Sequence, residues 1–184
     1  IAAETDQFGV KIISSSADFI EIEYTPQLQG WEKVSMENGQ EAFIPKIPGT
    51  RVEKFEPGVP GNLVRSEVIT VPAPTGFKTV ETSISGKRTY GKLLAPVPYL
   101  KNINNLPNEI YAADKRKYSE MEISDLVSVE YSGISRSRHL AEIKFRAAYY
   151  DHSSGKTIVP EKIYLKINFT ENPVNGNISD KYDP

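Results

Sequence analysis

Few residues of this chain are of a type that could do covalent or proton-transfer chemistry. The sequence contains no cysteine, and its two histidines are His139 and His152. A thiol nucleophile, a redox dithiol pair and a thiolate zinc site are therefore excluded. Neither histidine has a carboxylate or a second histidine at metal-ligand spacing, so we expect both at the solvated surface. The sequence predicts no metal site and no cofactor.

The serines and carboxylates also form no recognisable catalytic set. No Gly-x-Ser-x-Gly motif occurs, and no side chain is nominated as the base for a serine nucleophile. Glu21 and Glu23 share one face of an expected strand, where they could act as an acid–base pair. A charged outer face that keeps a sheet soluble explains the same pattern more simply. We predict that this chain is not an enzyme.

Length and composition limit the classes of partner. With 184 residues, 39% of them hydrophobic, the chain suits one domain with a real core. The net charge of -2 gives no basic face, so nucleic acid is not expected as a partner. No apolar run is long enough to span a bilayer. The chain begins at Ile1, as expected after signal-peptide removal or after trimming to a domain, and the sequence does not separate the two.

Strand patterns dominate the elements that would position any functional residue. Apolar and polar residues alternate most clearly at 18–25, 142–150 and 162–169. The members expected to point inward are Ile20, Ile22, Tyr24, Ile143, Phe145, Ala147, Tyr149, Ile163, Leu165, Ile167 and Phe169. Further strands are expected at 8–14, 31–36, 40–44, 63–71, 77–84, 89–94 and 121–131. The pattern predicts an all-β fold, an antiparallel sandwich or barrel-like sheet with little or no helix.

Turn residues and gaps in the strand pattern set the predicted organisation. Tight reversals are expected at 37–39, 85–87, 132–133 and 151–156, and the prolines, Pro160 among them, are expected at strand boundaries. Residues 101–119 form the longest stretch without clear alternation, and long loops of this kind are usually functional or disordered. We predict a flexible tail at 1–7, one β-domain at 8–170 and a linker toward a downstream domain at 171–184.

Two proline-rich segments carry a family resemblance. Residues 57–64 read Pro-Gly-Val-Pro-Gly-Asn-Leu-Val and lead into a strand, and residues 94–98 read Leu-Ala-Pro-Val-Pro. With the strands around them, and with the hairpin expected near 151–156, this succession resembles the N-terminal prodomain of gingipain-type cysteine peptidases of clan CD and related type IX secretion proteins. The match runs from Val10 to Phe169. It departs from the family pattern at Gly61-Asn62, where a second Leu-Pro step is common.

The resemblance implies a tethered inhibitor and folding aid rather than a catalyst. The partner would be the cognate cysteine peptidase catalytic domain, in cis and downstream of Pro184, and the protein would be secreted or reach the cell surface through the bacterial periplasm. A basic side chain would fill the specificity pocket of the peptidase, and the position of Lys101 matches that role. Lys115, Arg116 and Lys117 are rival candidates for that role, or an activation cleavage site.

Two other functions remain open at this point. The first is a non-inhibitory structural β-domain of a related secretion-system protein. The second is a carbohydrate-binding or adhesion module, for which Trp31 and the ten tyrosines could supply stacking surfaces.

Overall fold

The computed structural model describes residues 6–72, 77–121, 123 and 125–169. Within these ranges the fold is all-β, as predicted, with twelve strands and one five-residue helix. The strands are β1 (Val10–Ser15), β2 (Phe19–Tyr24), β3 (Gly30–Ser35), β4 (Glu41–Lys46), β5 (Thr50–Val52), β6 (Leu63–Val71), β7 (Phe77–Tyr90), β8 (Tyr99–Ile103), β9 (Leu106–Ile110), β10 (Val127–Ser135), β11 (Arg138–Asp151) and β12 (Lys156–Phe169). The helix is α1 (Lys115–Ser119). No described helix is long and apolar enough to cross a membrane.

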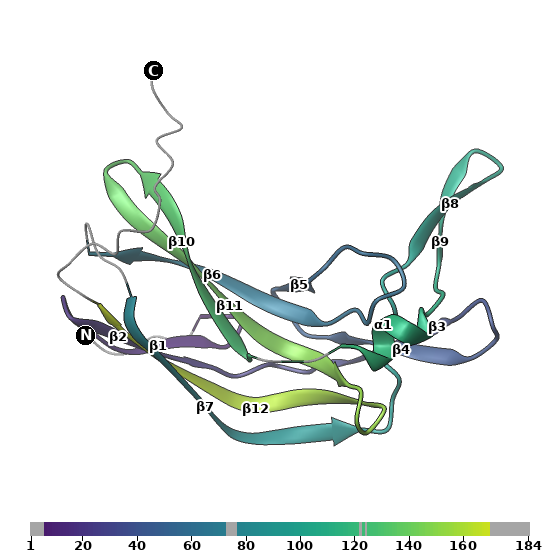
Figure 1. Cartoon of the computed structure of the whole chain (residues 1–184), viewed down its shortest axis with the longest axis horizontal. Coiled ribbons are helices and arrows are strands. Elements are labelled where there is room, and N and C mark those ends of the chain that lie inside the picture. Colours follow the sequence, from purple (N-terminus) through teal and green to yellow (C-terminus); the bar gives the residue numbers. More distant parts are fainter. Residues whose placement is uncertain (1–5, 73–76, 122, 124, 170–184) are drawn as a thin grey trace.

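The main body is one eight-stranded antiparallel sheet that curls on itself (Figure 1). Its order is β1-β2-β12-β11-β6-β5, and β7 and β10 flank β12 and β11 respectively. The long hairpin β11–β12 joins the two halves of this sheet, as the turn chemistry at 151–156 predicted. The strongly curled, half-barrel form agrees with the predicted sandwich or barrel-like sheet.

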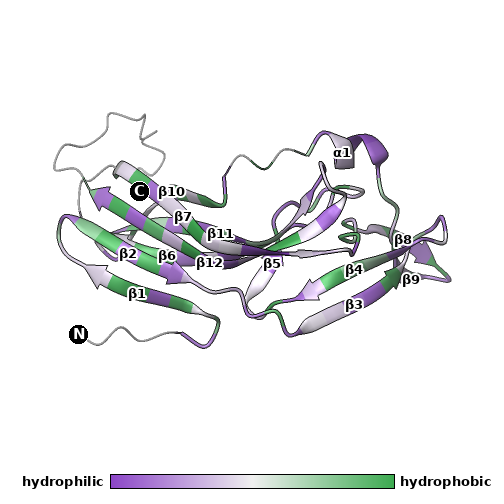
Figure 2. Ribbon diagram, turned by 90° about the horizontal axis from the view of Figure 1, so that it is seen from below, coloured by the Kyte–Doolittle hydropathy of each residue, from purple (hydrophilic) through white to green (hydrophobic). Residues whose placement is uncertain are grey.

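The core lies between the two halves of the curled sheet. It combines Ile20, Ile22 and Tyr24 of β2 with side chains of β11 and β12. The Tyr24 and Phe145 rings lie 5.3 Å apart between centroids, and neither side chain is exposed. Apolar and polar residues alternate along these strands (Figure 2), because successive side chains of a strand point to opposite faces. The inward faces predicted for 18–25 and 162–169 are confirmed, although Phe169 is only partly buried. At 142–150 the prediction holds as far as Ala147. Beyond it Ala148, predicted outward, is buried and Tyr149 is only partly buried, because the register shifts between Arg146 and Ala148.

A smaller lobe sits at one end of the sheet and is built from the hairpins β3–β4 and β8–β9 (Figure 1). Val34, Met36, Ala42 and Ala95 form its own small core. Phe43 and Leu94 make a parallel bridge that holds the proline-rich segment against β4. The β8–β9 hairpin projects from this lobe (Figure 1).

Several local expectations were wrong. The glycines of the turns predicted at 85–87 and 132–133 lie inside β7 and β10, next to register shifts of the sheet. A β-bulge also needs a permissive backbone, so glycine there does not require a reversal. Pro160 lies within β12 beside a bulge, not at a strand boundary. The irregular segment predicted at 101–119 instead contains the β8–β9 hairpin and α1.

The chain ends fall mostly outside the described residues. This holds for 1–5 of the predicted tail and for the whole linker predicted at 171–184. Asp6, the first described residue, accepts hydrogen bonds from the backbone N–H groups of Phe8 and Val10 at 2.9 and 2.7 Å. Its carboxylate also pairs with Arg65 at 3.0 Å.

Two buried tyrosines provide a matched test of this packing. The Tyr118 hydroxyl donates to the Leu94 carbonyl at 2.7 Å, whereas the Tyr24 hydroxyl has no hydrogen-bond partner among the described residues. Burial raises the pKa of both hydroxyls, because the charged phenolate is poorly solvated there. Both tyrosines are thus buried, but only one hydroxyl has a partner that offsets the lost hydration.

We expect Tyr118→Phe to lower the free energy of unfolding by about 1–3 kcal/mol, because it leaves the buried Leu94 carbonyl unpaired. Tyr24→Phe removes an unsatisfied polar atom, so the free energy of unfolding should stay the same or rise by a few tenths of a kcal/mol. Urea unfolding followed by circular dichroism measures both. Equal losses in the two variants would contradict this assignment of the two hydroxyls.

Candidate interaction surface

The described residues contain no catalytic constellation around the two histidines. His139 Nδ1 lies 2.7 Å from the Tyr131 hydroxyl on the β10–β11 hairpin, and His152 is exposed in the β11–β12 turn. No group of three or more His, Asp or Glu side chains within the described ranges could hold a metal ion. Both histidines therefore lie where the sequence placed them, at the surface.

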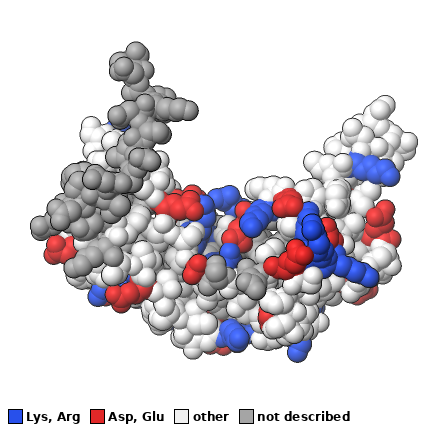
Figure 3. Space-filling model, in the orientation of Figure 1, with Lys and Arg blue, Asp and Glu red and all other residues white. Residues whose placement is uncertain are grey.

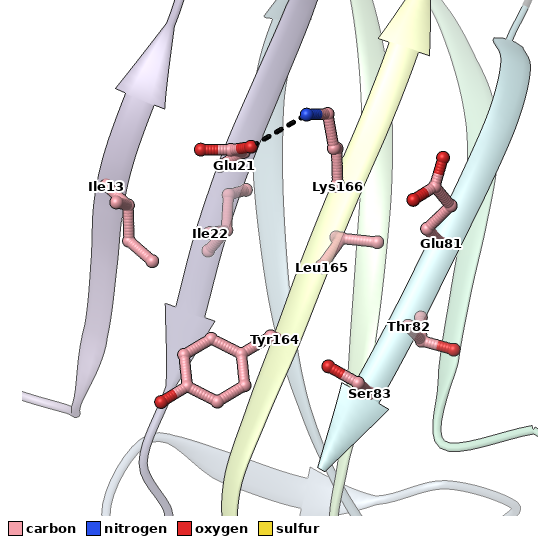
Figure 4. Close-up of a pocket in the computed structure, with 9 residues that line it drawn as sticks. All are labelled: Ile13, Glu21, Ile22, Glu81, Thr82, Ser83, Tyr164, Leu165 and Lys166. Carbon is pink, nitrogen blue, oxygen red and sulfur yellow. Dashed lines mark ion pairs between the residues drawn. The ribbon is translucent and has the colours of Figure 1, made fainter. Parts of the chain in front are cut away.

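The paired carboxylates of β2 are engaged in cross-strand ion pairs. Glu21 pairs with Lys166 at 2.9 Å, and Glu23 pairs with Lys162 at 3.1 Å. The Glu21 pair borders a surface hollow of about 370 Å³ over the outer face of the sheet (Figure 4). Each carboxylate faces a cation rather than a second acid or a nucleophile. This arrangement agrees with the charged outer face and not with acid–base work.

The concave side of the molecule carries acidic and basic side chains that are mixed (Figure 3). Arg51 pairs with Glu142 at 3.2 Å, and Arg146 pairs with Glu53. Lys144 lies between Glu142 and Glu130, 3.4 and 3.3 Å away. Because these charges neutralise one another, this face offers no basic stripe for a polyanion.

The β8–β9 hairpin is the most exposed element of the small lobe. Asn104 and Asn105 have φ of 53° and 63°, the two consecutive positive values of a two-residue type I′ turn. Asparagine tolerates this region better than most residues, which explains why two of them stand at the tip. The tight turn fixes the register, so that Lys101 lies opposite Asn108.

One face of this hairpin presents a lysine among apolar side chains. Directly opposed and alternate residues share a face, which places Lys101 with Tyr99, Ile103 and Leu106. The three apolar neighbours are 44%, 45% and 66% exposed. No other described residue forms an ion pair or hydrogen bond with the Lys101 side chain. The sequence predicted the lysine but not the apolar side chains around it.

The other three predicted basic residues lie on α1, near the base of the hairpin. Asp114 caps this helix by accepting from the N–H groups of Arg116 and Lys117. Lys117 Nζ pairs with Glu56 at 2.6 Å and donates to the Pro57 carbonyl at 3.2 Å. The hydrogen bond between the Lys117 ammonium and the Glu56 carboxylate lowers the pKa of Glu56 and raises that of Lys117. Lys117 is therefore committed to the fold.

Lys115 and Arg116 differ from Lys117 in that their side chains are exposed and form no ion pair or hydrogen bond with any described residue. The helix sits against the hairpin through Gly58, where a Cβ would lie 3.0 Å from the Tyr99 hydroxyl and 3.3 Å from the Asp114 side chain. The structure thus gathers Lys101, Lys115 and Arg116 at one end of the molecule.

An apolar groove lies beside the hairpin and was not predicted. It has a volume of about 530 Å³, and Phe55 and Leu100, each 75% exposed, stand on its rim. Its floor contains the segment at 94–98 that carried the family resemblance. Leu100 lies on the opposite hairpin face from Lys101, since neighbouring residues of a strand point to opposite sides.

Comparison with known proteins finds the same fold in gingipain structures. The chain aligns with a structure addressing the zymogenic latency of gingipain K from Porphyromonas gingivalis, with a TM-score of 0.68 and 17% sequence identity, over 92% of this chain and 96% of that one. It aligns with a structure of the complex of the RgpB pro- and mature domains, also from Porphyromonas gingivalis, with a TM-score of 0.72 and 14% identity, over 96% and 90%.

The chain has the fold of a gingipain prodomain. No protein-family model and no curated protein sequence matches it. The gingipain-type resemblance seen in the sequence is thus confirmed at the level of fold, at low identity.

Proposed function

We propose that this chain is the prodomain of an exported bacterial gingipain-type cysteine peptidase. It binds the cognate catalytic domain in cis, downstream of Pro184, assists its folding and blocks its cleft until cleavage. One observation carries this proposal: on a gingipain-prodomain fold, a projecting hairpin presents Lys101 free of any described partner and surrounded by exposed apolar side chains.

The chemistry of the hairpin suits insertion into a specificity pocket. A lysine ammonium can pair with a carboxylate at the bottom of such a pocket, while Tyr99, Ile103 and Leu106 exclude water around the rim. The type I′ turn holds this strand conformation before binding, which lowers the entropy lost on association. Tethering raises the effective concentration of the hairpin, so a modest interface is sufficient.

The carbohydrate alternative has less support. The Trp31 ring is part-buried and packs edge-on against Tyr90, with 5.0 Å between centroids. The ammonium of Lys92 lies 5.6 Å from the same ring. A sugar-stacking platform needs a free ring face, and this ring is committed to the fold. The non-inhibitory structural domain differs from our proposal only in leaving the cleft open, so one measurement separates the two.

The test is to titrate the purified domain into its cognate catalytic domain, expressed separately, and to follow hydrolysis of a small peptide substrate. We expect inhibition at micromolar concentration or below that is competitive with the substrate. Binding by calorimetry without inhibition would instead identify the non-inhibitory structural domain. Absence of both binding and inhibition would refute the prodomain assignment.

A further inference from the structure

The outer edge of β7 is the least protected strand edge among the described residues. β7 pairs only with β12, and no described backbone group bonds to its other side. Other outer strands are shortened or distorted: β5 has three residues, β1 is bulged between Ile12 and Ser14, and β10 between Tyr131 and Gly133. Such devices block edge-to-edge pairing. β7 lacks them over 79–84, where its register with β12 is regular.

The residues of this regular stretch suit pairing with another strand. From Thr79 to Ile84 it contains no proline or glycine and one charge, Glu81. Val80 and Ile84 lie on the core-side face of the sheet, opposite Ile167 and Ile163 of β12, yet they are 43% and 40% exposed. They remain exposed because no described strand continues the sheet beyond β7. A further strand would cover them.

We propose that two copies of this chain associate by antiparallel pairing of their β7 strands about a twofold axis through Thr82. In this register Val80 of each copy lies opposite Ile84 of the other, which forms two equivalent apolar pairs on the core-side face. Thr82 lies opposite its own symmetry mate. Such a self-complementary contact closes on itself and does not propagate into fibres. The half-sheet β1-β2-β12-β7 of one copy then continues into the same half-sheet of the other copy.

Charge favours this register over its neighbours. An axis through Glu81 would bring two carboxylates directly opposite one another, which destabilises a strand pair. An axis through Thr82 places Glu81 opposite the Ser83 hydroxyl instead. Within its own copy the Glu81 carboxylate accepts a hydrogen bond from Asn168 Nδ2 at 3.4 Å. In Figure 4 the Ser83 side chain points toward Tyr164, and Thr82 points to the other side of the strand.

The contact has a defined length and leaves the proposed inhibitory hairpin free. Beyond Ile84 the bulge at Gly86 and the exposed Lys87 and Arg88 end the regular edge. The interface is small, so the dimer should be weak, with a dissociation constant in the micromolar range. In Figure 1 the β8–β9 hairpin rises from the end of the molecule opposite to the start of β7. Dimer formation therefore does not depend on the proposed function.

The first experiment measures mass by sedimentation velocity from low to high micromolar protein. We expect the parent to shift from monomer to dimer over this range. The double variant Val80→Lys and Ile84→Lys should remain monomeric, because each lysine would face another across the axis. The matched control, Val68→Lys with Ile134→Lys, changes exposed aliphatics of β6 and β10 and should dimerise like the parent. A monomeric parent at every concentration, or a lysine variant that dimerises like the parent, overturns the proposal.

A mixing experiment keeps the test independent of folding. The variant Val80→Glu with Ile84→Glu should also be monomeric alone, but mixed with the double lysine variant it should give a heterodimer, since opposite charges then face each other. Recovery of the dimer shows that both variants are folded and that the contact is β7 with β7. Failure of the mixture to associate, with both variants folded by circular dichroism, counts against the β7 contact.

The absence of cysteine allows the register itself to be read by cross-linking. Thr82→Cys places one thiol of each copy beside the axis, at a Cα separation of about 4.5–5.5 Å that a disulfide can bridge. Mild oxidation should give a covalent dimer much faster for Thr82→Cys than for Thr89→Cys, which is also exposed on β7. Glu81→Cys and Ser83→Cys should cross-link to each other rather than to themselves. Equal rates at Thr82 and Thr89 would refute the register.

Discussion

Lys101→Ala is expected to raise the inhibition constant of the domain toward its cognate catalytic domain by roughly 30-fold or more, equivalent to about 2 kcal/mol or above. The reason is that the proposed pocket would then contain an unpaired carboxylate, while the apolar flank of the hairpin remains in place. Steady-state inhibition kinetics with a small peptide substrate measure the change. Lys101→Arg tests whether the pocket requires lysine or accepts either base, because the two differ in hydrogen-bonding geometry.

Two controls distinguish a basic side chain inserted into the specificity pocket from a general electrostatic effect. Lys156 is an exposed lysine of the β11–β12 hairpin, and Lys156→Ala should leave inhibition unchanged. Lys115→Ala and Arg116→Ala test the rivals at the base of the hairpin, and we expect less than a threefold change for each, about 0.6 kcal/mol. If Arg116→Ala abolishes inhibition and Lys101→Ala does not, the side chain that fills the pocket is Arg116 of α1. If none of the variants differs from the parent, neither Lys101 nor Lys115 nor Arg116 enters the pocket.

Phe145→Ala is expected to lower the free energy of unfolding by about 3–5 kcal/mol, the second large effect. Phe145 is fully buried on β11, and its ring packs against Tyr24 of the other half of the sheet. Truncation removes apolar surface from the core and leaves a cavity, because strands held by hydrogen-bonded ladders on both sides relax little.

Urea unfolding of the parent and of Phe145→Ala measures this loss. Val68→Ala is the matched control, since Val68 is 61% exposed on β6, the strand beside β11, and should change stability by less than about 0.5 kcal/mol. A loss below about 1 kcal/mol for Phe145→Ala would contradict the close packing of the two half-sheets around this ring.

The sequence predicted well those strands that have one buried and one solvated face. Residues 18–25 and 162–169 alternate in type because β2 and β12 lie over the core. Their inward residues are buried as expected, except Phe169, which is partly buried. The 63–71 strand coincides with β6. The prodomain fold followed from weak motifs in the correct order rather than from any single residue.

The sequence did not predict the features that depend on solvent exposure or on which strands pair. The β8–β9 hairpin is exposed on both faces, so its residues need not alternate, and its segment resembled a loop. Gly86 and Gly133 were mistaken for turns, since glycine serves bulges and reversals equally. The apolar residues around Lys101 gave no signal, because a lysine in a polar stretch looks the same whether its neighbours in space are apolar or charged.

The pairing of β2 with β12 has a consequence for synthesis on the ribosome. The strand at Phe19–Tyr24 pairs with residues 163–168. The ladder between β2 and β12 therefore forms only after the last described strand has been synthesised. Contacts so far apart in sequence form slowly. Until Phe169 leaves the exit tunnel, one half-sheet lacks its central strand and the chain stays open. The β-domain therefore closes late, only after its last described strand has been made.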